Sequence, residues 1–333
     1  MKIPNVFKNF YQKIYIALSV THTKTDVSVN IYNGDQLIET KKESFETTKI
    51  NNKLYDFVSS YISQTPYFYI STLNISTDQG SISTCSNSNI AKHTDVGSSL
   101  VICNEEWSTY AQKIDIDKLE SKYDRFGLDF IYPSIFLLTN IFSDKIEIEL
   151  ALYVLVQDDM LNVSVFKNGK LLFAEYFVLP DKNKKGPKAE EEIESVEDLF
   201  DDSAMDDLDD LDELDELDEL DELDGIDELD AIDDFSKKSD TNEINIDSDD
   251  LLEGFDEDYK RFLLIKNALE KFYHDSEYED VFVEKAYIAS SSTIDSLKSS
   301  LEDELFLSVF SRKIDLCDEI NKLSKKEVDS SDV

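Results

Sequence analysis

Residues 162–171 read NVSVFKNGKL, and the first part of this stretch alternates between polar and apolar side chains. Such alternation indicates a strand that buries one face. The dipeptide NG at 168–169 then interrupts the pattern, and Asn-Gly is a strong hairpin signal because the tight turn needs a positive φ at both central positions. The same pattern occurs at 26–46, where the turn NGD occupies 33–35. The sequence therefore predicts two β-hairpin units of one design, each with a glycine in its turn.

Further strands and helices surround both hairpins, and each hairpin is followed by a helix and another strand. Helices are expected where apolar residues recur at a spacing of three and four. The polar stretch 78–89 is expected to be a loop, and Gly127 is expected to end a helix with a left-handed backbone. The expected strands are 14–20, 26–32, 36–46, 67–75, 98–103, 128–132, 146–156, 161–166, 171–179, 281–289 and 306–310. The expected helices are 52–64, 107–111, 117–126, 133–142, 259–273, 294–305 and 313–325.

This duplicated order predicts an α/β protein with an actin-like (ribonuclease H-like duplicated) fold of two lobes. The second hairpin is similar to that of PilM, the cytoplasmic actin-like protein of type IV pilus assembly, and the resemblance covers about 14–180 and 259–312. GspL of type II secretion is a similar candidate, although it carries a transmembrane helix that this chain is not expected to have. Four further segments resemble PilM, namely WSTY at 107–110, LE at 119–120, FGLD at 126–129 and YPSIFLL at 132–138.

An acidic segment interrupts the second unit. Residues 189–236 contain 26 carboxylates and no lysine or arginine, and many belong to the repeat Leu-Asp-Glu. The stretch 189–258 carries a formal charge of −33, out of −40 for all 333 residues. Apolar residues recur at every third position from Met205 to Phe235, so on an α-helix they would spiral instead of forming one stripe. We expect a long disordered insertion; the alternative is an acidic-hydrophobic segment that docks on a basic partner.

These features divide the chain into four parts. Residues 1–180 are expected to form the first lobe and the start of the second, and 181–258 the insertion. Residues 259–326 would complete the second lobe, and 327–333 would be a frayed C-terminus. Without the insertion the chain is nearly balanced in charge and long enough to bury a substantial core.

Composition excludes several classes of function. Outside the insertion no basic block is large enough to neutralise a run of phosphates, so direct nucleic-acid binding is not expected. Cys85, Cys103 and Cys317 are too few and too scattered for a disulfide framework, and the histidines fit no zinc pattern. No apolar run is long enough to span a membrane, and the N-terminus lacks the features of a secretory signal, so the expected location is the cytoplasm.

The resemblance also identifies where a nucleotide would bind. Actin-like ATPases use two hairpin loops of the type Asp-x-Gly and a glycine step near adenosine, so that backbone amides reach the phosphates. The corresponding positions here are Ser19 and Thr21 in the first loop, Leu155 and Gln157 in the second, and Ser290 and Ser291 at the third. We therefore expect a pseudo-ATPase with no catalytic residue, cofactor or metal. The alternative is a working ATPase in which Asp158 or Asp159, close to the second loop, still holds ATP and Mg²⁺.

By the same resemblance, the expected function is that of a cytoplasmic structural scaffold, peripheral to the inner membrane. It would dock on an inner-membrane PilN-like protein through a short cytoplasmic peptide of that partner, and it would assemble as a homo-oligomeric ring. The machine would be a type IV pilus, a type II secretion system or a flagellar motor. Two alternatives stay open: a functional ATP-binding ATPase, and an acidic chaperone or nucleic-acid mimic acting through the Leu-Asp-Glu repeat.

Overall fold

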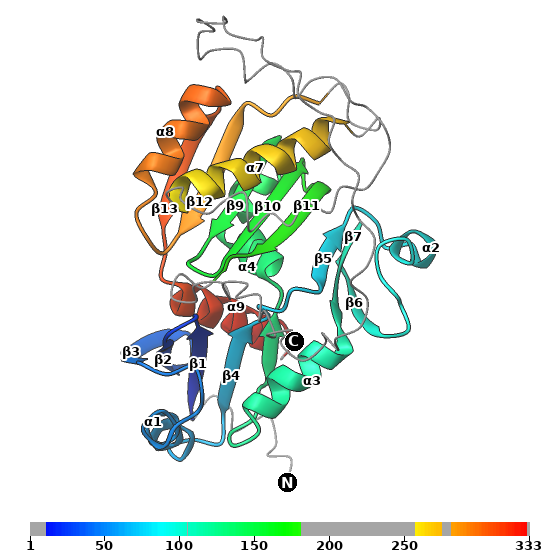
Figure 1. Ribbon diagram of the computed structural model, residues 1–333. Helices are drawn as coiled ribbons and strands as arrows, with labels where there is room; N and C mark the ends of the chain where they lie inside the picture. Colours follow the sequence, from blue (N-terminus) through cyan, green and yellow to red (C-terminus); the bar gives the residue numbers. More distant parts are fainter. Residues whose placement is uncertain (1–10, 105, 181–256, 275–280, 332–333) are drawn as a thin grey trace, which may run out of the picture. The chain divides into compact units, whose positions relative to one another are not determined.

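The first sheet of the computed structural model has five strands in the order β3-β2-β1-β4-β8 (Figure 1). The structure describes residues 11–104, 106–180, 257–274 and 281–331. β2 is antiparallel to β1 and β3, whereas β4 is parallel to β1 and β8 is parallel to β4. Helix α1 (Asn52–Ile62) connects β3 to β4. The strands are β1 (Gln12–Val20), β2 (Thr25–Asn33), β3 (Gln36–Phe45), β4 (Phe68–Leu73) and β8 (Phe130–Tyr132).

The second sheet repeats this plan in the order β11-β10-β9-β12-β13. β10 is antiparallel to β9 and β11, whereas β12 is parallel to both β9 and β13. Helix α7 (Glu257–His274) precedes β12, and α8 (Asp295–Glu304) connects β12 to β13. The strands are β9 (Ala151–Val156), β10 (Met160–Lys167), β11 (Lys170–Val178), β12 (Lys285–Ser290) and β13 (Ser308–Lys313).

The two sheets therefore share their strand order and their strand directions, which is the duplicated ribonuclease H-like arrangement of an actin-like fold. The predicted fold class is confirmed. Helices α3 (Lys113–Lys122), α4 (Ser134–Ile141) and α5 (Ser143–Ile146) complete the first copy, and α9 (Leu316–Ser331) completes the second. The expected insertion, 181–258, lies outside the described residues except for 257–258, which begin α7.

Strand β9 shows how the sequence divides its side chains between two cores. All six residues are buried, because β9 is the central strand of its sheet and both faces are covered. Leu152, Val154 and Val156 pack against α7 and α8, whereas Tyr153 and Leu155 face the core that contains α4 and α9. Helices α4 and α9 thus lie between the two sheets (Figure 1). Successive side chains of a strand point to opposite faces of the sheet. A continuous apolar run can therefore fill both cores from a single strand.

The second hairpin turn has the backbone that Asn-Gly predicts, whereas the first turn has positive φ only at its glycine. Gly34 has φ +58°, and Asn168 and Gly169 have φ +51° and +83°. Gly127 follows α3 at φ +76°, and its N–H donates to the carbonyl of Tyr123 at 2.7 Å. Positive φ is strained for residues with a Cβ, so the glycines fix the places where these elements end.

A three-stranded antiparallel sheet, in the order β5-β7-β6, corrects the prediction for 78–111. It consists of β5 (Gln79–Ile82), β6 (Ser99–Asn104) and β7 (Trp107–Gln112), with the short helix α2 (Asn87–Ile90) between β5 and β6. The helix expected at 107–111 is wrong because β7 forms backbone hydrogen bonds with strands on both sides. Its Trp, Thr and Tyr side chains also favour strands. The loop expected at 78–89 contains β5 and α2.

The prediction for the C-terminal end is also corrected. Helix α9 runs from Leu316 to Ser331, whereas the sequence predicted a helix over 313–325 and a frayed end at 327–333. Val328 is 4% exposed and packs in a small cluster with Tyr15 and Tyr32 of the first sheet. One apolar residue in a polar stretch was a weak signal, and only its contact with the sheet explains the last turns of the helix. Residues 332–333 lie outside the described residues.

Three expected strands have different boundaries. The strand expected at 146–156 begins at Ala151, because 143–146 form α5. The strand expected at 281–289 begins at Lys285, and that expected at 306–310 is β13, Ser308–Lys313. In each case an apolar stretch just before the strand resembles the strand itself, and only pairing with a neighbour defines the start.

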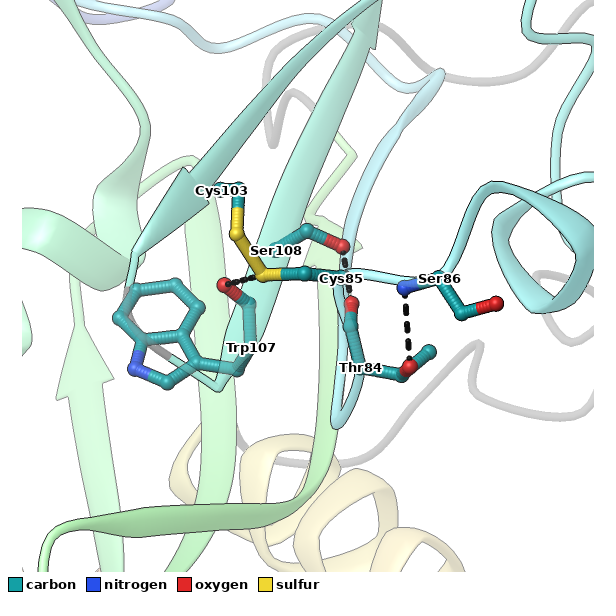
Figure 2. Close-up of a disulfide and its surroundings, with 6 residues drawn as sticks. All are labelled: Thr84, Cys85, Ser86, Cys103, Trp107 and Ser108. Carbon is teal, nitrogen blue, oxygen red and sulfur yellow. Dashed lines mark hydrogen bonds between the residues drawn. A yellow bond between two sulfur atoms is a disulfide. The ribbon is translucent and has the colours of Figure 1, made fainter.

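Cys85 and Cys103 form a disulfide, although the three cysteines were expected to be too few and too scattered for a disulfide framework (Figure 2). Their Cα atoms are 5.6 Å apart although 18 positions separate them in sequence. The chain returns along β6 to the point where it left β5, and this return brings the two residues together. Cys317 has a free thiol and is buried.

Candidate functional site

A cavity of about 830 Å³ lies next to the turns β1–β2 and β9–β10, the segments that follow β12 and β13, and parts of β2 and β3. The ends of the two duplicated hairpins thus meet at one site. Three lysines and five carboxylates line it, together with several hydroxyl groups. The lining residues are Ser19, Thr21, Lys24, Asp26, Val27, Ser28, Lys42, Glu43, Ser44, Gln157, Asp158, Asp159, Ser291, Ser292, Lys313, Ile314, Asp315, Leu316 and Cys317.

The structure brings most of the predicted nucleotide positions to this cavity. Ser19, Thr21, Gln157 and Ser291 all line it. Leu155 instead has a fully buried side chain in the core of β9. Ser290 ends β12, is 2% exposed, and is not among the lining residues. Asp158 and Asp159, named for the alternative ATPase, also line the cavity.

Backbone amides at the three predicted stations already have acceptors within their own turns. Thr21 N donates to Lys24 O at 2.9 Å, and Gln157 N donates to Met160 O at 2.9 Å. Ser292 N donates to Ser290 Oγ at 3.2 Å. Each turn is therefore closed by its own hydrogen bonds, which use amides that a phosphate would need. No glycine lines the cavity in the described part of the chain.

Two of the three lysines are paired with carboxylates. Lys24 Nζ lies 2.9 Å from Asp26 Oδ2, and this hydrogen bond raises the pKa of Lys24. Lys42 Nζ lies 2.8 Å from Asp315 Oδ2 and 2.5 Å from Asp318 Oδ2. Burial acts to lower the pKa of Lys42, but the two carboxylates outweigh it and raise the pKa. Since carboxylates outnumber lysines on the wall, the cavity has no net positive field for an anion.

The second turn is held from outside by Arg261 of α7. Its side chain is 5% exposed, and Nη2 donates to the carbonyl of Gln157 at 3.2 Å. Nη1 donates to Asp258 Oδ1 at 3.1 Å, while Asp158 Oδ1 is 4.0 Å from Nη2. The Gln157 side chain accepts from Ser291 Oγ at 2.9 Å, which joins the second station to the third.

Asp159 is a buried carboxyl group on the cavity wall. It is 8% exposed, and burial raises its pKa above the ordinary value. A backbone hydrogen bond and the nearby His22 act in the opposite direction without outweighing burial. His22 Nε2 in turn donates to the carbonyl of Leu179 at 2.9 Å, and Leu179 N donates to Asp159 O at 2.8 Å.

Helix α9 begins at the cavity and continues onto the first sheet. Asp318 Oδ1 accepts from Ser28 Oγ at 3.0 Å, and the buried Asn321 donates through Nδ2 to the carbonyl of Ser28 at 3.0 Å. Cys317 Sγ donates to the carbonyl of Asp26 at 3.4 Å. Together with the Lys42 pairs, these bonds attach the end of the second copy to β2 and β3 of the first.

Sequence reasoning missed Lys42, Asp315 and Arg261. The two partners Lys42 and Asp315 are 273 positions apart, so no local pattern could connect them. Arg261 lies on the buried side of the amphipathic helix α7. The spacing of apolar residues predicts the helix but does not indicate what a buried arginine contacts. The hairpin turns were found because their positions follow from the duplicated fold, and the rest of the wall comes from elements that only the three-dimensional arrangement brings near.

The duplicated sheets and the cavity next to their hairpin turns define a protein of the actin-like fold. The chain belongs to the family described as a domain of unknown function (DUF8341), whose model matches residues 152–329. A second model, also described as a domain of unknown function (DUF8569), matches residues 10–140. The two matches divide the chain between α4 and β9, where the first structural copy ends and the second begins.

Several solved structures are similar to this chain. One is a protein of Bacteroides thetaiotaomicron VPI-5482 with an actin-like ATPase fold and unknown function; identity is 11%, coverage is 97% of this chain and 99% of that one, and the TM-score is 0.46. Another is a PilM–PilN type IV pilus biogenesis complex, with 10% identity, coverage of 90% and 88%, and a TM-score of 0.45. A third is an exopolyphosphatase from Cytophaga hutchinsonii, with 8% identity, coverage of 95% and 80%, and a TM-score of 0.32.

No curated protein matches the chain. Among the helices of the described residues, none combines the length and the apolar character that a membrane span requires.

Proposed function

We propose that this protein is a non-catalytic actin-fold scaffold that holds another protein. The observation that carries the proposal is the closure of all three nucleotide stations by their own hydrogen bonds. Thr21 N, Gln157 N and Ser292 N have acceptors in their own turns. A phosphate would have to break these bonds and would find no glycine at which the backbone approaches closely. The residues present do not fit the group that the fold family would suggest.

The charge of the cavity supports the same proposal. Lys24 and Lys42 are neutralised by Asp26, Asp315 and Asp318, so their charge is not available to a triphosphate. Enzymes of phosphoryl transfer use lysine or arginine and Mg²⁺ to stabilise phosphate charge. This wall has more carboxylates than lysines, and a nucleotide triphosphate would add further negative charge.

A third supporting observation is the attachment of α9 to the first sheet. Hinge closure around a ligand requires that two halves of a molecule move. Here Ser28 and Lys42 of the first sheet bind Asp318 of α9, and the carbonyl of Ser28 also accepts a hydrogen bond from Asn321 of α9. Breaking these contacts would leave the Nδ2 group of the buried Asn321 without its partner. A fixed arrangement suits a scaffold better than a nucleotide-driven cycle.

The partner follows from the sequence resemblance to PilM. We propose an inner-membrane protein of PilN type, held through a short peptide of its cytoplasmic tail, in a type IV pilus, a type II secretion system or a flagellar motor. The protein would then lie at the cytoplasmic face of the inner membrane and assemble as a ring. The resemblance assigns the class of partner and not the residues that hold the peptide.

Cross-linking in intact cells, followed by purification from the membrane fraction, tests the proposal. An inner-membrane protein with a short cytoplasmic N-terminal tail is expected in the cross-linked product. A peptide of that tail should then bind the purified chain with the affinity of the intact partner. Recovery of no inner-membrane protein would contradict the scaffold proposal.

ATP binding is the second candidate, because the cavity is large enough for a nucleotide and includes Lys24, Asp158 and Asp159. Titration calorimetry with Mg-ATP separates the candidates. The scaffold proposal expects no saturable heat at micromolar concentrations. Saturable binding that is lost when Asp158 and Asp159 are both changed to Ala would establish ATP binding at this site and contradict the scaffold-only proposal. The chaperone alternative is tested by deletion of residues 190–234, which should abolish function only if the acidic repeat carries it.

A further inference from the structure

Cys85 and Cys103 are joined at the rim of the three-stranded sheet (Figure 2). Cys85 follows β5, and Cys103 lies on β6, which ends the strand order β5-β7-β6. The bond therefore attaches the connection between β5 and β6, residues 83–98, to the edge of the sheet. Cys103 is exposed and Cys85 is half-buried, so the disulfide borders solvent.

The disulfide is the main attachment of the first part of this connection, residues 83–93. Residues 94–98 are also held by hydrogen bonds, because Gln112 Nε2 donates to Thr94 Oγ1 at 3.2 Å and Lys113 N donates to the carbonyl of Ser98 at 2.9 Å. Within 83–98 Ile90 is 1% exposed, whereas every other residue is half-buried or exposed. The carbonyl of Thr84 accepts a hydrogen bond from Ser108 Oγ at 2.6 Å, next to the disulfide (Figure 2). A segment with so little buried apolar surface has low local stability, so a covalent bond is a major constraint on its position.

The site is also suited to the reduced state. Cys85 Sγ lies 3.3 Å from the carbonyl oxygen of Trp107, as the dashed line in Figure 2 shows. In the disulfide this sulfur carries no proton. As a thiol it donates a hydrogen bond to the same carbonyl without moving. Reduction therefore replaces a covalent bond with a hydrogen bond and leaves β7 in place.

We propose that Cys85 and Cys103 form a reversible thiol–disulfide exchange site that is reduced by dithiols of the thioredoxin class and re-formed by disulfide oxidants. A thiolate of the dithiol attacks the sulfur of Cys103, the S–S bond breaks, and Cys85 leaves as a thiolate that takes up a proton. The second thiol of the reductant then displaces Cys103 from the mixed disulfide. Two electrons and two protons pass to the pair, and the reductant ends as a disulfide. Reduction frees residues 83–93, whereas the hydrogen bonds of 94–98 and the two five-stranded sheets stay in place.

The third cysteine does not take part in this exchange. Cys317 is buried at the start of α9, and its thiol donates to the carbonyl of Asp26. Burial raises the pKa of Cys317, so the nucleophilic thiolate is disfavoured. Alkylation can therefore distinguish the pair from Cys317 in the folded protein.

The test uses the full chain, purified without reductant and equilibrated in buffers with different ratios of reduced to oxidised dithiothreitol. Cysteines are alkylated without denaturant and identified by mass spectrometry, while circular dichroism monitors the fold. Cys85 and Cys103 are expected to become labelled together along a two-electron transition, to lose labelling on reoxidation, and to react at least about tenfold more than Cys317. Labelling of the pair only after denaturation, or failure of the disulfide to form in oxidising buffer, would overturn the proposal.

Limited digestion with trypsin tests the structural consequence. Lys92 is exposed within 83–98, and cleavage after it is expected to be about tenfold faster in the reduced protein. The double variant Cys85→Ser, Cys103→Ser should be cleaved at the fast rate in both buffers, whereas Cys317→Ala should keep the redox response. Equal cleavage of the oxidised and reduced wild-type protein after Lys92 would show that the disulfide does not control this segment.

Discussion

Replacement of Arg261 by Met should strongly destabilise the second copy of the fold. The guanidinium group is 5% exposed and makes two hydrogen bonds, to Asp258 Oδ1 at 3.1 Å and to the carbonyl of Gln157 at 3.2 Å. Met has a similar apolar stem and no donor, so packing is mostly kept while both bonds are lost. The variant thus isolates the polar contribution of the side chain.

The size of the effect follows from what each partner retains. Removing one member of a buried ion pair costs about 3–5 kcal/mol. Asp258 still accepts from the amide of Leu297 at 3.3 Å, which favours the lower end of that range. Asp158 and Glu257 have side chains that are 52% and 40% exposed, so their longer contacts with Arg261 add little. The Nε atom of Arg261 is buried without a partner in the described structure, and its loss offsets part of the cost.

We therefore expect a loss of about 3 kcal/mol in the free energy of unfolding, which lowers Tm by about 6–12 °C for a domain of this size. Thermal denaturation monitored by circular dichroism measures it. Lys271→Met is the matched control on the same helix, since Lys271 has a side chain that is 62% exposed and pairs with Glu175. That control should change stability by less than about 1 kcal/mol. If Arg261→Met melts within about 1 °C of Lys271→Met, the buried contacts contribute nothing net and the reasoning is wrong.

Three further predictions concern single positions. The pKa of Asp159 is raised in the folded state, so its contribution to stability is present below the unfolded pKa and is lost as pH rises through the folded pKa; urea unfolding of Asp159→Asn should therefore show a gain over wild type that grows with pH, and a constant difference would contradict it. Gly169 has φ +83°, so Gly169→Ala should cost about 1–2 kcal/mol, and an unchanged Tm would show that the turn relaxes freely. Val328→Ala should cost about 2 kcal/mol because the side chain is 4% exposed, whereas the exposed Lys326→Ala should be nearly neutral; equal effects would mean that the last turns of α9 do not pack.

The fold was predictable from the sequence because its signals are local and occur twice. The turns around Gly34 and Gly169 could be identified from Asn-Gly and the flanking alternation, and repetition of the pattern defined the fold class. Strand β7 was not predictable in this way. The six residues from Trp107 to Gln112 become a strand by pairing with β6, which directly precedes them, and with β5, which lies in a stretch that was expected to be a loop.

The candidate site also contains parts that could be predicted from the sequence and parts that could not. Ser19, Thr21, Gln157 and Ser291 line one cavity because they lie at the ends of strands that the duplicated fold brings together. Leu155 does not line the cavity, because its side chain lies deeper along β9 and is fully buried in the core between the sheets. The disulfide could not be predicted because Cys85 lies in a stretch that was expected to be an unstructured loop. Its return to the sheet depends on β6 and β7.

The turn β9–β10 is structurally connected to the described residues on both sides of the acidic segment. Described residues on both sides of the insertion bind the backbone of the turn β9–β10. Leu179 N donates to Asp159 O, and Arg261, one helical turn after Glu257, donates to Gln157 O. These bonds occupy carbonyl groups of the turn, while the amide of Gln157 is bonded to Met160 O. The turn β9–β10 therefore anchors the described residues that precede and follow 181–256, because Leu179 and Arg261 both donate to its carbonyl groups.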